Sequence, residues 1–179
     1  MLNSPSEALL PFRFCPVCGS PHFEVNDFKS RRCRECGFVF YLNASASVVG
    51  IVPDERGSIL VGRRAFEPAK GTLDLPGGFV DAGESLEQAV VRELLEETGA
   101  RAVPLRWLFS VPNIYRYSGM DIPTVDNFFL CRLENPEAVC AHDDVADLFW
   151  TPVSELRAED FGLHSIRSAI PRLKKVLEE

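Results

Sequence analysis

The sequence has no apolar run close to the ~20 residues that a membrane-spanning helix requires. Its first residues, "MLNSPSEALLPFRFC", also lack a basic region followed by a long apolar stretch, so we predict no secretory signal. The sequence therefore has neither of the usual features of a membrane protein or a secreted protein. We therefore expect a cytoplasmic location and no membrane partner.

Basic residues are fewer than acidic residues. The chain has 19 Lys and Arg against 26 Asp and Glu, which gives a net charge of −7. Proteins that bind nucleic acid usually carry a basic surface, so we do not expect nucleic acid as a partner. An acidic protein that binds phosphates needs a local source of positive charge, such as a metal ion held by carboxylates.

Four of the six cysteines form two CxxC pairs, Cys15 with Cys18 and Cys33 with Cys36, and fourteen residues separate the pairs. A glycine follows each pair and permits a tight turn. This spacing is typical of a structural zinc site with four thiolates. We therefore predict a small zinc ribbon over residues 1–42. Two disulfides or four free thiols are the alternatives, and disulfides would require an oxidising compartment.

The role of this ribbon is open at this stage. Its segment 29–34, "KSRRCR", is locally basic and could contact nucleic acid. Equally, the ribbon could support the main domain or a dimer. The other two cysteines, Cys131 and Cys140, stand among apolar residues, and we expect both in the core.

Residues 43–179 have the pattern of a larger α/β domain. Hydrophobic patterning and turn residues predict strands at 47–52, 58–64, 102–112, 124–133 and 147–153, and helices at 85–98 and 164–179. The glycine-containing stretch 70–85 is predicted to be an ordered loop, and 113–123 a second loop.

The helix at 85–98 has clear ends. Ser85 with Gln88 forms a capping-box pattern at its start, and Gly99 is expected to end it. The helical repeat places five side chains on one face, which we expect to be buried: Val90, Val91, Leu94, Leu95 and Thr98.

Three carboxylates, Glu93, Glu96 and Glu97, fill the adjacent arc of the same helix. Like charges at this spacing repel by about 0.2–0.5 kcal/mol per pair. A divalent cation such as Mg²⁺, which prefers hard oxygen ligands, would remove that repulsion. The alternative is a solvated acidic face. The preceding "LPGGFVDAGE" favours the metal, because its glycines let the backbone approach an ion or a diphosphate closely.

Gly78, Glu84 and the run from Arg92 to Ala100 match every defined position of the Nudix box, over 23 residues. The chain therefore resembles the Nudix hydrolases. With its four-cysteine segment, it is similar to the NADH pyrophosphatase-like group of that family. The resemblance implies an α/β/α sandwich around a mixed sheet, preceded by a small zinc ribbon, and it suggests a homodimer.

The resemblance also implies an activity and roles for individual residues. Nudix hydrolases use Mg²⁺ or Mn²⁺ to cleave the diphosphate bridge of nucleoside diphosphate derivatives, which are small-molecule substrates. By position in the box, Glu93, Glu96 and Glu97 match residues that bind the metal or activate water. The backbone carbonyl of Gly78 matches a further ligand, and Glu84 with Arg92 matches a structural ion pair.

Three further features bear on catalysis and substrate. Counting back from Trp150, Asp144 matches a carboxylate that relatives add from outside the box, although it could be a simple loop acid. Phe79, Tyr115 and Tyr117 are candidate contacts for a base, and the tyrosines could instead pack their own loop.

The substrate is left open between NADH, ADP-ribose and similar dinucleotides or nucleotide sugars. In "SVPNIYRYSG" only Ser110 and Pro112 persist from the Ser-Gln-Pro-Trp-Pro-Phe-Pro signature of the NADH pyrophosphatases. The alternative functions are a nucleotide-sensing regulator and a nucleic-acid-binding ribbon protein.

Overall fold

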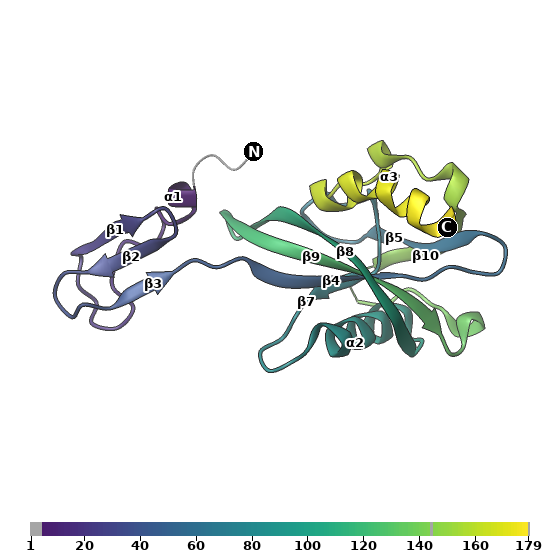
Figure 1. Cartoon of the computed structure of the whole chain (residues 1–179), viewed down its shortest axis with the longest axis horizontal. Coiled ribbons are helices and arrows are strands. Elements are labelled where there is room, and N and C mark those ends of the chain that lie inside the picture. Colours follow the sequence, from purple (N-terminus) through teal and green to yellow (C-terminus); the bar gives the residue numbers. More distant parts are fainter. Residues whose placement is uncertain (1–4, 144, 179) are drawn as a thin grey trace. The chain divides into compact units, whose positions relative to one another are not determined.

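The computed structural model describes residues 5–143 and 145–178 (Figure 1). The chain divides into two compact units, Met1–Ala44 with Ile114–Pro123, and Ser45–Asn113 with Thr124–Glu179. Each is described by itself. Within the described residues, no helix combines the length and the apolar character needed to cross a bilayer.

The cysteine-containing segment begins with the short helix α1, Pro5–Ala8. It then forms an antiparallel sheet of three strands: β1 Phe23–Asp27, β2 Ser30–Cys33 and β3 Val39–Tyr41. The buried core is very small and consists of Cys15, Phe23 and Cys33, with Phe12, Phe38 and Phe40 packed against it. So few buried side chains give little hydrophobic stabilisation, which is typical of modules that need a metal to fold.

The larger unit contains two sheets. The first has the strand order β7-β4-β9-β8, and the second β10-β5-β6. Strand β4 pairs antiparallel with β7 and parallel with β9, so the first sheet is mixed. The strands are β4 Ser45–Ile51, β5 Ser58–Arg64, β6 Leu73–Asp74, β7 Gly77–Phe79, β8 Ala102–Tyr117, β9 Met120–Leu133 and β10 Val145–Pro152.

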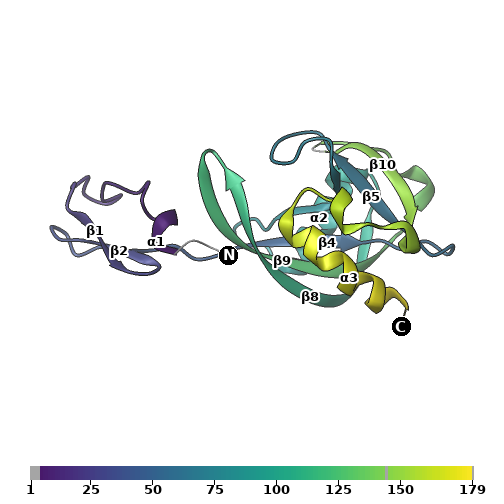
Figure 2. The same cartoon turned by 90° about the horizontal axis from the view of Figure 1, so that it is seen from above.

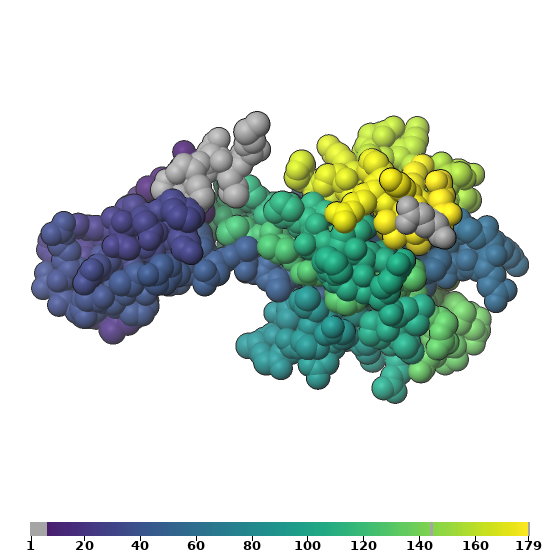
Figure 3. Space-filling model, viewed as in Figure 1, coloured from purple at the N-terminus to yellow at the C-terminus, as the bar shows by residue number. Residues whose placement is uncertain are grey.

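Two helices cover opposite sides of these strands: α2, Leu86–Thr98, and α3, His164–Glu178. Short 3₁₀ turns lie at η1 Pro136–Ala138, η2 Val153–Glu155 and η3 Ala158–Asp160. Figures 1 and 2 show α3 on one side of β4 and β9, and Figure 1 shows α2 on the other. In the space-filling view of Figure 3, the yellow C-terminal helix and the blue-teal α2 region form opposite margins of this unit.

Strand β4 shows how the two faces of the sheet pack against different helices. Its side chains alternate between the two faces. Val48 packs in a cluster with Val90 and Leu94 of α2. Its neighbour Val49 packs in the other cluster, with residues such as Ile170 of α3. The predicted α/β class, with helices on both sides of a mixed sheet, is confirmed.

Most of the predicted elements are present, but the predicted loop at 113–123 is wrong. Strand β8 continues to Tyr117, and β9 begins at Met120 after a two-residue turn. Ser118 and Gly119 adopt positive φ angles of 49° and 77°, which suit the tight turn of a hairpin. The stretch 70–85 holds the short strands β6 and β7. Cys131 is buried as predicted, whereas Cys140 is exposed.

Candidate active site

Helix α2 is fixed at its start by the predicted capping box. The Ser85 hydroxyl accepts a hydrogen bond from the backbone N–H of Gln88 at 3.3 Å, and the Gln88 side chain accepts one from the backbone of Ser85 at 2.8 Å. These bonds satisfy two backbone donors that have no partner inside the helix.

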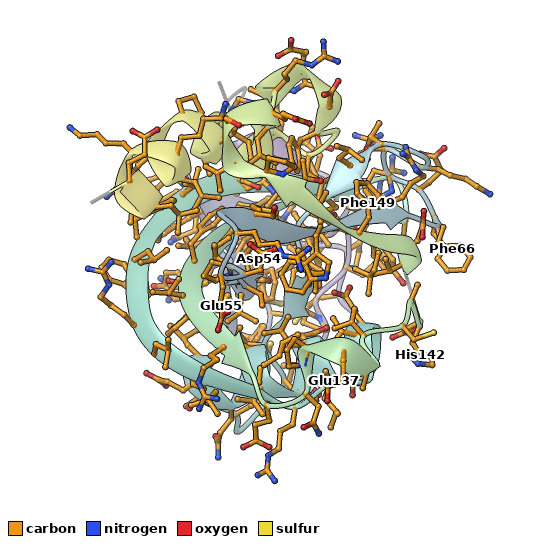
Figure 4. The ribbon with its side chains drawn as sticks, turned by 90° about the vertical axis from the view of Figure 1, so that its right-hand side faces the viewer. Asp54, Glu55, Phe66, Glu137, His142 and Phe149 are labelled. Carbon is orange, nitrogen blue, oxygen red and sulfur yellow. The ribbon has the colours of Figure 1, made fainter. Side chains whose placement is uncertain are left out.

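The other end of α2 is also closed. Gly99 takes the left-handed conformation, with a φ of 70°, and ends the helix as predicted. Beyond β9 the chain returns to this end, where the backbone N–H of His142 donates to the carbonyl of Glu97 at 2.9 Å. Figure 4 labels His142 at the outer margin of the unit. Both ends of the carboxylate-bearing helix are therefore held in place.

The face that α2 buries differs from the predicted one at two positions. Leu95 is 46% exposed, so its prediction as a core residue is wrong, whereas Glu97 is only 7% exposed. Leu94 of the same helix packs closely against Gly50. A Cβ added there would lie 2.7 Å from Leu94, so only a glycine lets Leu94 pack this deeply. The buried residues of the helix are Ala89, Val90, Leu94, Glu97 and Thr98.

The buried carboxylate of Glu97 is held by the backbone. Gly77 donates its N–H to Oε2 of Glu97 at 2.9 Å. Gly77 has a φ of 152°, and a Cβ there would lie 2.1 Å from the carbonyl oxygen of Val48. The position thus requires glycine, and the close approach of the two strands brings the N–H to the carboxylate.

The next glycine is packed against a second carboxylate. A Cβ on Gly78 would lie 2.5 Å from Oε1 of Glu93, so the Glu93 carboxylate rests directly over the glycine backbone. The Glu93 side chain is 14% exposed. This burial raises the pKa of the Glu93 carboxyl, and the neighbouring guanidinium of Arg92 partly offsets the effect.

Arg92 lies among the acidic residues. Its guanidinium contacts Glu84 at 2.9 Å, Glu93 at 2.8 Å and Glu96 at 3.0 Å. It also donates to the backbone carbonyl of Phe79 at 2.9 Å. Hydrogen bonds from Arg92 lower the pKa of the Glu84 carboxyl, and Glu84 in turn is the main cause that raises the pKa of Arg92. One cation therefore offsets much of the repulsion that the sequence builds into this helix.

The four N-terminal cysteines gather as a metal site would require. Over residues 5–143 and 145–178, they are the only set of three or more His, Cys, Asp or Glu whose ligand atoms lie within 4.8 Å of one another. The Sγ atoms of Cys15 and Cys36 are 3.6 Å apart, as are those of Cys18 and Cys33. Four sulfurs placed tetrahedrally at ~2.3 Å from one zinc ion would be separated by about 3.8 Å.

The sulfur of Cys33 accepts a hydrogen bond from the backbone. The backbone N–H of Cys36 donates to the sulfur of Cys33 at 3.5 Å. This hydrogen bond is the main cause that lowers the pKa of Cys33 to about 6. Thiolates are the metal-binding form of cysteine, so the local backbone favours coordination.

The glutamates of α2 do not converge in this way. Arg92 holds Glu93 and Glu96, while Gly77 holds Glu97. Asp144, the predicted additional carboxylate, lies outside the described residues.

The three predicted aromatic contacts lie on strands. Phe79 is on β7 and is 40% exposed. Tyr115 is half-buried on β8, and Tyr117, on the same strand, is 61% exposed.

A buried polar cluster around Asp126 was not predicted from the sequence. Asp126 of β9 is 6% exposed. Its carboxylate accepts hydrogen bonds from Thr124 Oγ1 at 2.8 Å, from Asn113 Nδ2 at 3.2 Å and from Ser47 Oγ. The signal was an acidic residue inside an apolar strand, "TVDNFFL", because a buried charge requires partners.

A family model described as the NUDIX domain matches residues 42–173. The chain belongs to the NUDIX domain family. This match contains α2, both glycines and the Arg92 cluster, so the carboxylate-bearing helix lies inside the family's domain.

Among similar proteins, the NAD-capped RNA hydrolase NudC of Photobacterium profundum is 30% identical over 145 residues, which cover 81% of this chain and 52% of that protein. The chain spans about half the length of such curated relatives. A NUDIX hydrolase from Nitrosomonas europaea shares the fold, with a TM-score of 0.73, 24% identity and coverage of 93% of this chain and 91% of that one.

A NUDIX domain of Shewanella oneidensis NrtR, solved in complex with ADP ribose, also shares the fold. Its TM-score is 0.59 at 24% identity, over 75% of this chain and 89% of that one.

Proposed function

We propose that this NUDIX protein is a metal-dependent hydrolase that cleaves the diphosphate bridge of a nucleoside diphosphate derivative. The observation that carries the proposal is the packing of two carboxylates, Glu93 and Glu97, onto the backbone of Gly77 and Gly78. A protein with a net charge of −7 has little to attract a diphosphate except through such a site.

The donor set suits Mg²⁺ or Mn²⁺. Glu93, Glu96, Glu97 and the carbonyl of Gly78 would supply oxygen ligands, which these hard cations prefer. Glycine at position 78 is required for the Glu93 carboxylate to lie against the backbone. When bound, the cation would neutralise phosphate charge and lower the pKa of a coordinated water.

The roles of the chain's own residues follow from their surroundings. Glu97, buried and bonded to Gly77, is proposed as the central ligand, and Glu93 and Glu96 share ligand and base roles. A carboxylate in the base role accepts the proton of the attacking water as the phosphoanhydride bond breaks. The Arg92–Glu84 pair fixes the loop to the helix. Asp144 is proposed to add a carboxylate.

For the substrate we propose NADH, ADP-ribose or a related dinucleotide. The name of the NudC relative, which refers to NAD-capped RNA, and the ADP ribose bound to the NrtR domain both support this class. NAD at the end of an RNA is therefore a substrate to include in any test. Phe79, Tyr115 and Tyr117 are proposed to contact a base or ribose.

We further propose that Cys15, Cys18, Cys33 and Cys36 hold a structural Zn²⁺, since four thiolates leave no open position for catalysis. A zinc ribbon over residues 1–42 followed by the hydrolase domain over 43–179 remains our division of the chain. Free thiols support a reducing compartment such as the cytoplasm. The family resemblance suggests a homodimer, which light scattering coupled to size-exclusion chromatography would test.

The decisive experiment is a panel of NADH, ADP-ribose, nucleotide sugars and NAD-capped RNA, assayed with Mg²⁺ and with Mn²⁺ for products of bridge cleavage. We expect turnover of at least one member and its loss in Glu97→Gln. If the wild type and Glu97→Gln are equally inactive on every member, the proposed hydrolase activity is wrong.

A further inference from the structure

We propose that one surface of the N-terminal cysteine module binds single-stranded RNA. It consists of two exposed rings, Phe28 and Tyr41, and two cations, Lys29 and Arg32, and we call it the aromatic–basic surface. The choice of RNA rests on the proposed function, because NAD at the end of an RNA is one of the candidate substrates. Binding of the RNA chain goes beyond that function, since it requires no diphosphate and no cleavage.

The two rings stand at one end of the three-stranded sheet of this module. Phe28 and Lys29 form the turn between β1 and β2, and Tyr41 is the last residue of β3. The backbone N–H of Lys29 donates to Oδ1 of Asp27 at 2.9 Å, and the N–H of Leu42 donates to the carbonyl of Lys29 at 2.8 Å. The turn is therefore bonded both to β1 and to the residue that follows β3.

One ammonium group lies close to both rings. Nζ of Lys29 is 5.8 Å from the centre of the Phe28 ring and 5.9 Å from the centre of the Tyr41 ring. Each distance is within the ~6 Å at which a cation attracts an aromatic ring. A phosphate bound to Lys29 would therefore bring the adjoining bases next to the two rings.

Both rings are open to solvent: Phe28 is 63% exposed and Tyr41 is 49% exposed. The core cluster of the module has only three buried residues, so two rings left in water are a large loss of possible hydrophobic stabilisation. Clusters of exposed apolar side chains often mark binding surfaces. Rings beside cations offer the two contacts that single-stranded nucleic acid needs, stacking on bases and attraction of phosphates.

Arg32 lies on the same face of the sheet as Tyr41. Arg32 pairs with Val39 of β3, and Tyr41 pairs with Ser30 of β2. Directly paired residues share a face, and so do residues two positions apart on one strand. The side chains of Arg32 and Tyr41 therefore point in the same direction, and both are exposed.

The two cations of the surface are not engaged by carboxylates. In the part of the chain that the structure describes, Lys29 and Arg32 form no ion pair. Glu24 is directly opposite Arg32, but its carboxylate is bound by Arg34 at 2.6 Å. Asp27 attracts Lys29 electrostatically, but its carboxylate is hydrogen-bonded to the backbone of the turn. Phosphate groups can therefore approach both cations.

Charge is distributed unevenly along the chain. Residues 1–44 hold five Lys and Arg against four Asp and Glu, whereas residues 45–179 hold 14 against 22. The net charge of −7, on which we expected no nucleic-acid partner, therefore comes from residues 45–179. The cysteine module does not repel a polyanion as the acidic hydrolase domain does.

The two rings favour a single strand over a duplex. Paired bases are covered by their neighbours in the stack, whereas unpaired bases can stack on Phe and Tyr side chains. A protein partner would require only an apolar contact, which a leucine side chain also provides. Replacing each ring by leucine therefore separates RNA binding from a protein contact.

The test measures binding of an uncapped, fluorescein-labelled single-stranded RNA to the whole zinc-loaded chain by fluorescence anisotropy. We expect Phe28→Leu and Tyr41→Leu each to weaken binding about 10-fold, through the loss of one stacked base. Phe66→Leu is the matched control, because it removes a ring that is 59% exposed on the hydrolase domain (Figure 4). Equal affinity of the wild type and both ring variants would overturn the inference.

Lys29→Gln tests the phosphate contact. The logarithm of the binding constant should fall less steeply with the logarithm of salt concentration, with a slope smaller by about 0.7, the value for one phosphate on a single strand. Lys70→Gln is the control, since Lys70 is exposed on the hydrolase domain, and it should keep the wild-type slope. A wild-type slope in Lys29→Gln would contradict the inference.

A measurement on the wild type does not depend on the folding of any variant. The backbone N–H signals of Phe28 and Lys29 in ¹H–¹⁵N spectra should shift with the single-stranded RNA and much less with a blunt RNA duplex of the same length. If both RNAs shift these signals equally, or if neither does, the rings do not stack on bases and the inference is wrong.

The outcome also separates this inference from the proposed function. If diphosphate compounds are cleaved but uncapped RNA binds the wild type, Phe28→Leu and Tyr41→Leu equally, the RNA surface is wrong and the hydrolase remains. If no compound is cleaved while RNA binding depends on Phe28 and Tyr41, the RNA surface remains and the hydrolase is wrong.

Discussion

The backbone N–H of Gly77 donates a hydrogen bond to Oε2 of Glu97 at 2.9 Å, although twenty residues separate them in the chain. This bond joins the edge strand β7 to α2 at the point where the box glycines meet the box glutamates. The first prediction concerns this contact.

In Glu97→Gln, the amide oxygen can still accept from Gly77, so we expect the fold to persist while the charge is lost. Activity should fall by about 10²–10⁴-fold, the range for removal of a catalytic carboxylate. Steady-state kinetics and thermal unfolding measure the two effects. Glu87→Gln is the matched control, because Glu87 is an exposed acid in the first turn of the same helix. An equal loss in both variants would contradict a specific role for Glu97.

Gly78→Ala should damage the site without removing any charged group. The new methyl would lie 2.5 Å from the Glu93 carboxylate and force it away from the backbone. We expect Mn²⁺ affinity, measured by electron paramagnetic resonance, to fall about 10–100-fold, as when a metal ligand loses its support. Gly62→Ala is the control, since its methyl would meet a Val145 side-chain carbon at 3.1 Å. Unchanged Mn²⁺ affinity in Gly78→Ala would show that Glu93 does not need this position.

Glu84→Gln should reduce stability in a pH-dependent way. Arg92 lowers the pKa of Glu84 in the folded protein, so the ionised carboxyl stabilises the fold above its unfolded pKa of about 4.3. That contribution is lost as the pH falls through the lower, folded pKa. Urea unfolding should therefore separate Glu84→Gln from the wild type at pH 7, and the gap should narrow towards pH 3. A gap that is constant with pH would exclude an electrostatic origin.

Cys33→Ser should abolish metal binding by the N-terminal segment and unfold it, because its buried core consists of Cys15, Phe23 and Cys33. Elemental analysis should give about one zinc per wild-type chain, as expected for one four-thiolate site, and none in the variant. Cys140→Ser replaces an exposed thiol outside the cluster and should keep the zinc. Zinc retained by Cys33→Ser would refute the site.

The sequence predicted the local features of α2 well, because they depend on nearby residues. Ser85, Gln88 and Gly99 act within a turn of the helix ends, where chemistry alone decides the conformation. The prediction of the buried face of α2 was less accurate. Leu95 is more hydrophobic than Glu97, yet the carboxylate is the buried one. The buried carboxylate of Glu97 has a distant partner, the backbone N–H of Gly77, and Leu94 packs against Gly50, which has no side chain.

The sequence did not predict the β8–β9 hairpin or the buried polar cluster around Asp126, and the reasons are related. The stretch 113–123 has no long apolar run, and its sequence pattern predicts a loop around Ser118 and Gly119. Strand pairing across the sheet overrides such weak local preferences. Asp126 lies in an apparently apolar strand, and only the paired strands reveal Ser47 and Asn113 as its partners.

The alternation of side chains along β4 limits where this chain can gain or lose residues. Its successive side chains pack alternately on the α2 side and the α3 side of the sheet, and Val48 pairs with Gly78. Inserting or deleting one residue within β4 would exchange the two faces and move the glycine away from its carboxylate. Length variation is therefore expected at the exposed turn around Glu55, where added residues leave this pairing intact.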